Sequence, residues 1–97
     1  MGRTFVVPSH RDVEMVTDKA TVGRMVRAAR TKQALRIDDA AALCGVSVAL
    51  LSALEGDAER SVKLDKLLTI LDGLGLALLV TDKKRAREIA RAQQNDS

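Results

Sequence analysis

Three residues near the start of the chain have the side-chain types that acyl transfer requires. Ser9, His10 and Asp12 offer a hydroxyl nucleophile, an imidazole base and a carboxylate. Such a triad works only when rigid elements hold its members in hydrogen-bonded geometry, and the surrounding sequence predicts nothing that would orient them. We therefore expect no catalytic role for these residues, and we expect that the chain is not an enzyme.

The single cysteine limits the redox and metal chemistry that the chain can support. Cys44 has no second cysteine with which to form an internal disulfide, and a cysteine-rich metal site is excluded. Because Cys44 lies in an apolar run before Gly45, a packed, inert thiol is favoured over a reactive one. No glycine-rich phosphate loop follows a strand pattern, and no cluster of metal ligands is present. We therefore expect neither a metal nor a cofactor.

Length and composition indicate a small helical domain. The chain has 97 residues, which corresponds to one domain, and because 46% are hydrophobic but only 1% aromatic, the core must be aliphatic. The net charge of +3 permits an acidic partner such as nucleic acid, although charges of both signs also suit ordinary solubility. No apolar run reaches the roughly 18 residues of a membrane span, and no signal peptide is evident, so we expect a cytoplasmic protein.

The chain from residue 17 onward predicts a series of short helices. Thr17 or Asp18 can cap the first helix. One face of that helix carries apolar residues at the i, i+3, i+4, i+7 spacing, namely Val22, Met25, Val26 and Ala29. Asp38 and Asp39 favour the N-terminus of a second short helix that ends near Cys44.

A tight turn and a third helix follow. Gly45 supplies the turn because glycine adopts a left-handed backbone conformation at little cost. Ser47 then caps a helix predicted over Val48–Glu55, in which Leu51 and Leu54 point the same way.

The fourth predicted helix is apolar on two neighbouring stripes. The segment "LDKLLTILDGLG" places one stripe on Leu64, Leu67, Leu68 and Leu71. A second stripe consists of Ile70 and Leu74. Two apolar stripes on one helix suggest two packing partners, of which one is the core of the domain and the other is a second, unidentified surface.

The segment "LALLVT", residues 76–81, predicts a short strand after two glycines. A lone apolar strand needs a partner for its backbone groups. The same strand of a second copy, or the segment "TFVV" at residues 4–7, would provide one.

The two ends of the chain allow alternative interpretations. Residues 1–16 predict either a disordered arm or a short strand. Residues 82–97 are basic and predict a solvated helix or tail, with phosphate contacts or docking to another protein as functional alternatives. Residues 17–75 and 76–81 form the predicted helical domain and strand between them.

Four motifs together resemble a known family of regulators. They are "GRMVRAAR", "AALCGVS", "LLSALE" and "LDKLLTILDGLGLALLV", which lie within residues 21–80. This block is similar to the helix-turn-helix domain of the Xre/Cro repressor family, and more closely to HipB-type antitoxins. The resemblance implies an all-α, lambda-repressor-like bundle of four or five helices. It also implies a homodimer in which the strand after the last core helix forms an intersubunit sheet.

The resemblance assigns roles to particular residues of this chain. Arg30 and Glu55 would form a partly buried structural ion pair, although two unrelated surface charges remain the alternative. The dimer contacts would fall on Ile70, Leu74, Leu76, Leu78, Leu79 and Val80. The expected partners are double-stranded DNA, a second copy of the chain and a HipA-like kinase toxin.

The third helix carries few groups that read bases directly. If Val46, Leu51 and Leu54 face the core, its outward, base-facing residues are Ser47, Val48, Ala49, Ser52 and Ala53. Arginine, asparagine and glutamine are absent from this face, so thymine methyl contacts and serine hydrogen bonds remain.

Some charged residues around this helix favour DNA binding and others oppose it. Family members often begin the second helix with a glutamine, whereas this chain has Ile37 followed by two aspartates that would repel phosphates. Basic residues that could contact phosphates are Arg24, Arg27, Lys32, Arg36, Arg60 and Lys63, with Lys66 nearby.

The sequence therefore predicts a homodimeric transcription regulator, an antitoxin that represses its own toxin–antitoxin operon. The alternative is a degenerate helix-turn-helix module whose smooth third-helix face binds another protein instead of DNA.

Overall fold

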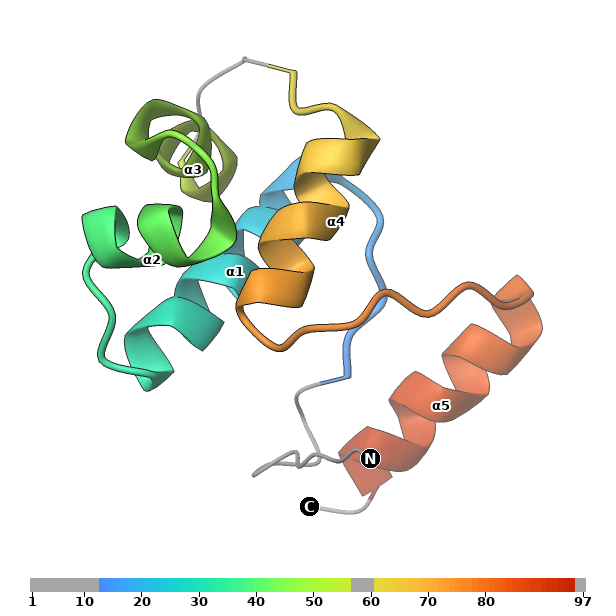
Figure 1. The fold of residues 1–97 in the computed structure, drawn as a ribbon. Coiled ribbons are helices and arrows are strands. Elements are labelled where there is room, and N and C mark those ends of the chain that lie inside the picture. The colour runs from blue at the N-terminus through green and yellow to red at the C-terminus, as the bar shows by residue number, and fades with distance from the viewer. Residues whose placement is uncertain (1–12, 57–60, 96–97) are drawn as a thin grey trace. The chain divides into compact units, whose positions relative to one another are not determined.

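The computed structural model describes residues 13–56 and 61–95, and these form five helices and no strand (Figure 1). Residues 16–79 form one compact unit that holds the first four helices, and α5 belongs to a second unit. The helices are α1 (Lys19–Lys32), α2 (Ile37–Cys44), α3 (Val48–Glu55), α4 (Leu64–Gly73) and α5 (Lys83–Asn95). The all-helical class is as predicted.

The N-terminus of α1 is capped by Asp18, one of the two predicted residues. Its carboxylate accepts hydrogen bonds from the backbone N–H of Thr21 at 2.8 Å and from the Thr21 hydroxyl at 2.7 Å. These bonds favour the ionised carboxylate and lower the pKa of Asp18. The cap therefore contributes stability above the unfolded-state pKa of about 3.9, and this contribution is lost as pH falls through the lower native pKa.

The turn between α2 and α3 follows the prediction residue by residue. Gly45 lies in the left-handed region with φ 71°, and the next N–H, that of Val46, bonds to the carbonyl of Ala41 at 3.0 Å. Ser47 then caps α3 by accepting a hydrogen bond from the N–H of Leu50 at 3.0 Å. The helix boundaries on both sides of the turn are therefore set locally.

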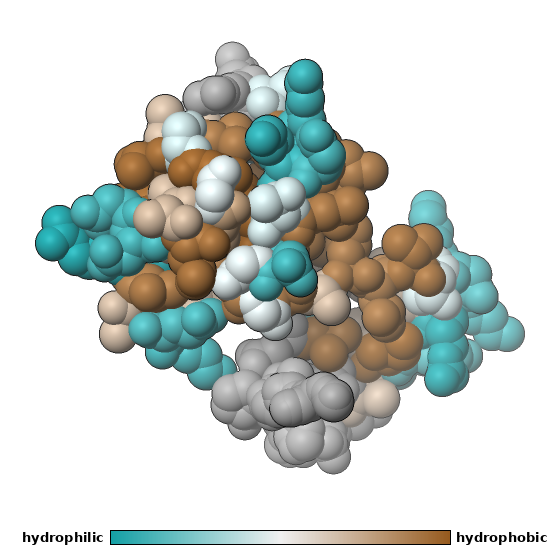
Figure 2. Space-filling view, in the orientation of Figure 1, coloured by the Kyte–Doolittle hydropathy of each residue, from teal (hydrophilic) through white to brown (hydrophobic). Residues whose placement is uncertain are grey.

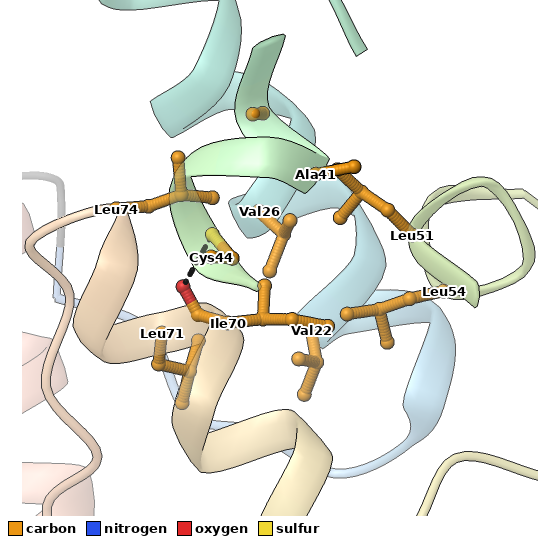
Figure 3. Close-up of a cluster of buried hydrophobic side chains, with 10 residues drawn as sticks. Val22, Val26, Ala41, Cys44, Leu51, Leu54, Ile70, Leu71 and Leu74 are labelled. Atoms are coloured by element: carbon orange, nitrogen blue, oxygen red, sulfur yellow. Dashed lines mark hydrogen bonds between the residues drawn. The ribbon is translucent and has the colours of Figure 1, made fainter. Parts of the chain in front are cut away.

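The core of residues 16–79 is aliphatic apart from one thiol (Figure 3). Its buried members are Val22, Val26, Ala40, Ala41, Cys44, Leu51, Leu54, Ile70, Leu71 and Leu74. The Cys44 Sγ lies 3.6 Å from the Ile70 carbonyl oxygen, to which the thiol donates. Burial raises the pKa of the Cys44 thiol, so it stays protonated at neutral pH. The predicted packing of this cysteine is confirmed.

Two glycines allow pairs of helices to approach at backbone distance. A Cβ at Gly23 of α1 would overlap the carbonyl oxygen of Leu54 in α3. A Cβ at Gly73 of α4 would lie 2.6 Å from the Sγ and 3.1 Å from the Cα of Cys44 in α2. The α1–α3 and α2–α4 contacts therefore depend on the absence of a side chain at these positions.

The two predicted stripes of α4 are regrouped in the structure. Ile70, Leu71 and Leu74 are 0%, 7% and 3% exposed, whereas Leu64 and Leu68 are 63% and 44% exposed. The assignment of Ile70 and Leu74 to the dimer interface is therefore wrong, because both side chains are enclosed in the chain's own core. The expectation of a second apolar face on α4 holds for its exposed leucines, and apolar surface is visible over this part of the chain (Figure 2).

Residues 76–81 form no strand within the described residues of the single chain. Leu76 donates its N–H to the Leu71 carbonyl at 2.7 Å and packs against the core. Leu78, Leu79 and Val80 are 41%, 72% and 89% exposed. The predicted strand is unsupported because no described backbone segment pairs with it, and the candidate partner at residues 4–7 lies outside the described residues.

The second unit contributes one regular helix, so the basic C-terminal segment is helical. Asp82 caps α5 by accepting a hydrogen bond from the N–H of Arg85 at 2.8 Å. Ala86, Ile89 and Ala90 are half-buried at helical spacing. Among the described residues, no single helix is long and apolar enough to cross a membrane; only α2 and α3 taken together, with a 112° bend, reach that length and composition.

Replacing Gly23 by alanine should destabilise the chain by about 3 kcal/mol, because the added methyl group meets backbone and forces α1 and α3 apart. Urea unfolding followed by circular dichroism would measure this loss. The control is Gly45→Ala, where the methyl group meets open space and only the left-handed φ costs about 1 kcal/mol. Equal losses in the two variants would contradict the close approach.

Candidate nucleic-acid interface

The α2–α3 pair has the geometry of a helix-turn-helix motif. The two helices are bent by 112° and are joined by residues 45–47. A turn of three or four residues that contains glycine, with helices at about 90–120°, is characteristic of this motif. The arrangement lets α2 support α3 from one side while the opposite side of α3 remains accessible.

The end of α3 is fixed to α1 by an ion pair between Arg30 and Glu55. The Arg30 Nε and Nη2 atoms donate to the two carboxylate oxygens of Glu55, each at 2.8 Å. The third nitrogen, Nη1, donates to the Leu35 carbonyl at 2.9 Å. The side chains are only 14% and 7% exposed, and the hydrogen bond to Glu55 raises the pKa of Arg30. The predicted structural ion pair is confirmed, and its planar fork also holds the loop after α1.

Two further contacts hold the same turn of α3, and sequence reasoning missed both. The Lys19 Nζ donates to the Ala53 carbonyl oxygen at 2.8 Å, near the start of α1. Gly23 lies directly against the Leu54 carbonyl. Residues 53, 54 and 55 are therefore each held by a different position along α1. For Gly23 the available signal was a glycine within an amphipathic, periodic helix, because such a residue usually has a packing reason.

The accessible face of α3 is smaller than predicted. Ser47, Val48, Ala49 and Ser52 are exposed, whereas Ala53 is only 7% exposed. The base-facing assignment of Ala53 is therefore wrong. The physical reason is that residues 53–55 pack closely on α1, so the accessible residues of this face lie between Ser47 and Ser52. The core-facing residues are as predicted, since Val46 packs on the core and Leu51 and Leu54 are buried.

The open face can donate hydrogen bonds and offer methyl groups. The Ser47 Oγ already accepts a hydrogen bond from Leu50, which leaves its hydroxyl hydrogen available to an acceptor. Ser52 presents a second hydroxyl one turn further along, and Val48 and Ala49 lie beside them. This combination suits phosphate or base acceptors and thymine methyl groups.

Two of the predicted phosphate-binding cations lie at helix N-termini. Arg36 and Lys63 occupy the N-cap positions of α2 and α4, and both are exposed. The Arg36 Nε lies 3.5 Å from an Asp38 carboxylate oxygen, with both side chains largely in solvent. Asp38 and Asp39 lie in the first turn of α2, where the helix dipole favours them. The predicted repulsion of phosphates by these aspartates is thus partly offset by Arg36.

The other predicted cations are more widely spread. Arg24 and Arg27 are exposed on the side of α1 that lies opposite Val22 and Val26. Arg24 also lies near enough to Asp18 to help lower the pKa of that carboxyl group. Lys32 is exposed in the last turn of α1. Arg60 lies outside the described residues, as do the residues considered for acyl transfer, Ser9, His10 and Asp12.

Within the described part of the chain, no group of three His, Cys, Asp or Glu side chains could hold a metal ion. No protein-family model matches the chain, and no curated protein matches it. The features that bear on function are therefore the geometry of α2 and α3 and the four sequence motifs.

Replacing Glu55 by alanine should cost about 3 kcal/mol of unfolding free energy, because Arg30 would keep a largely buried charge without its partner. The double variant Arg30→Met with Glu55→Ala should lose less than the sum of the single losses. Chemical denaturation of the four proteins would measure the coupling.

Asp38→Ala serves as the control for an exposed ion pair and should cost less than about 1 kcal/mol. A coupling energy near zero between Arg30 and Glu55 would contradict the structural role of the pair.

Proposed function

We propose that this chain is a transcription regulator that binds double-stranded DNA as a homodimer and inserts α3 into the major groove. The observation that carries the proposal is the combination of the 112° α2–α3 bend with an exposed face of α3, which consists of Ser47, Val48, Ala49 and Ser52. The last turn of α3 is anchored on α1, so its open face has a fixed orientation, which a reading helix needs.

The proposed reading mode relies on small contacts rather than on long polar side chains. Val48 and Ala49 contact thymine methyl groups, while the Ser47 and Ser52 hydroxyls bond to a base edge or a phosphate. Arg36 and Lys63 contact phosphates on either side of the helix. Because such contacts discriminate weakly between bases, DNA shape supplies a further part of the specificity.

The resemblance to HipB-type antitoxins also suggests a cellular role for the chain. The chain would act in the cytoplasm as a repressor of its own operon and as the antitoxin of a HipA-like kinase. Support for this part is the four sequence motifs alone.

The proposed dimer contact lies at residues 78–80, since Leu76 packs against the chain's own core. Leu78, Leu79 and Val80 are exposed apolar side chains in a segment without helix. Pairing with the same segment of a second copy would satisfy their backbone groups as a two-stranded sheet and cover the side chains.

A second candidate function is a protein-binding module without DNA reading. Leu43 of α2 and Val48 of α3 are 58% and 43% exposed, so large apolar side chains are accessible on both helices of the motif. An apolar partner surface would cover them, and binding would then be insensitive to salt.

Selection of bound duplexes from a randomised DNA pool at physiological salt tests the reading function. We expect a palindrome with half-sites about 10 base pairs apart, which matches two α3 helices in successive major grooves. Ser52→Ala should then weaken binding to the selected site about fivefold, which corresponds to one hydrogen bond of about 1 kcal/mol.

Thr69→Ala is the matched control, because Thr69 is exposed on α4 and its hydroxyl bonds to the Asp65 carbonyl of its own helix. Folded protein that leaves the pool random would rule out the reading function and favour the protein-binding module.

Replacing Leu78 by aspartate should convert the dimer to a monomer, because a charge would be placed at the apolar contact between copies. Light scattering would report a fall from twice the chain mass to the chain mass of 10.5 kDa. Leu43→Asp makes the same change at an exposed leucine of α2 and should leave the dimer intact. A Leu78→Asp variant with an unchanged dimer mass would refute this interface.

A further inference from the structure

The positive charge of the chain is concentrated in α5. This helix contains five basic residues, Lys83, Lys84, Arg85, Arg87 and Arg91, and one acidic residue, Glu88, so its net charge is +4. Residues 1–82 contain eleven basic and eleven acidic residues and are net neutral. Asp96 completes the total of +3. The part of the chain that holds the α2–α3 motif therefore has no charge surplus with which to attract a polyanion.

The cations of α5 are sorted by face. At 100° per residue, Lys83, Lys84, Arg87 and Arg91 lie within a sector of about 100°, and the half-buried Ile89 lies on the opposite side. Arg85 lies apart from them, and its Nη1 pairs with the Glu88 carboxylate at 3.6 Å. Figure 2 shows the hydrophilic surface of this helix. Glu88, the one acidic residue of α5, lies between Lys84 and Arg85 around the helix and pairs with Arg85.

We propose that this face of α5 binds the phosphate backbone of duplex DNA without regard to sequence, and supplies most of the electrostatic affinity of the protein. The proposal deepens the DNA-binding function given above and rests on it for the choice of partner. The two helices would then have different roles, because α3 would contact the bases that define the site and α5 would bind the phosphate backbone.

The dimensions of α5 fit this role. The row Lys83, Arg87 and Arg91 spans about 12 Å at 1.5 Å per residue, which corresponds to about three to four phosphates of one strand at 3.4 Å each. Leu76 is the last residue packed on the core before α5, and the seven residues from it to Lys83 reach at most about 25 Å. That reach exceeds the major-groove width of about 12 Å, so backbone flanking the α3 site is accessible.

Anionic membrane surfaces are the other polyanion that attracts basic amphipathic helices, but the apolar face of α5 is poorly suited to them. The half-buried stripe consists of two alanines and one isoleucine, Ala86, Ala90 and Ile89. Membrane-surface helices bury large side chains such as Trp, Phe and Leu among the lipid chains. The cations of α5 therefore favour a polyanion such as DNA, whose binding does not require the helix to bury large apolar side chains.

The test is the salt dependence of binding to a mixed-sequence 20-base-pair duplex, measured by fluorescence anisotropy with the full chain. The variant Lys83→Gln, Lys84→Gln, Arg87→Gln and Arg91→Gln keeps helix-forming side chains. Loss of four phosphate contacts should reduce the slope of log K against log salt by about 3.6. The wild type should therefore lose about 150-fold more affinity than the variant between 50 and 200 mM salt.

A pair of single variants on the same helix provides a charge-matched control. Arg87→Gln should lower the slope by about 0.9, whereas Arg85→Gln, which removes an equal charge outside the four-cation face, should leave the slope unchanged. Equal effects of the two substitutions would overturn the assignment of a face. An unchanged slope in the fourfold variant, or a wild type that binds phosphatidylserine vesicles but no duplex, would overturn the proposal itself.

The outcomes separate this inference from the reading function of α3. A steep, α5-dependent salt slope in a protein that selects no sequence would support α5 binding and remove the reading function. Selection of a palindrome by a protein whose slope is unaffected by the α5 substitutions would support reading by α3 and remove the role of α5.

Discussion

The orientation of α3 depends on how its last turn is held by α1. The carboxylate of Glu55 is satisfied by two nitrogens of Arg30, and the third nitrogen binds the loop after α1, so the guanidinium is shared among three segments. A largely buried charge pair is costly to desolvate, and it is retained only where hydrogen bonds compensate it well. Gly23 adds a steric condition, because the two helix backbones meet there. The ion pair and the glycine together fix the angle between α1 and α3. The orientation of the exposed face of α3 is therefore fixed as well.

Charge and shape are separated along the chain. The compact unit of residues 16–79 has a shaped helix-turn-helix surface with small side chains, while the basic surplus of the whole chain lies in α5. Contacts with base edges discriminate between sequences, and contacts with phosphates provide affinity and speed of association. Under the proposed division, mutation could change base discrimination in α3 while phosphate binding by α5 is preserved. Under the proposed function, this separation would also account for the lack of basic residues in α3.

The elements that local chemistry determines were predictable from the sequence, and the faces that depend on distant contacts were not. Capping residues and the left-handed turn set helix boundaries within a few residues, so Asp18, Gly45 and Ser47 were assigned correctly. The burial of Ala53 depends on packing against α1, which includes a lysine 34 residues away. Adjacent apolar stripes on α4 left its rotation ambiguous, and two core residues were therefore assigned to the dimer contact. The strand predicted for residues 76–81 was based on an unbroken apolar run, and such a run does not by itself distinguish a strand from the irregular, partly packed segment that the structure has.

The thiol of Cys44 makes the α2–α4 contact accessible to measurement. It is buried against Gly73, it donates a hydrogen bond to the Ile70 carbonyl of α4, and its pKa is raised by burial. A thiol-specific reagent needs both access and a thiolate, so it would react only when α2 and α4 have separated. The rate of modification at several denaturant concentrations would then report the free energy of that local opening. The sole cysteine of the chain is thus a native reporter of the contact between α2 and α4, and it requires no added label.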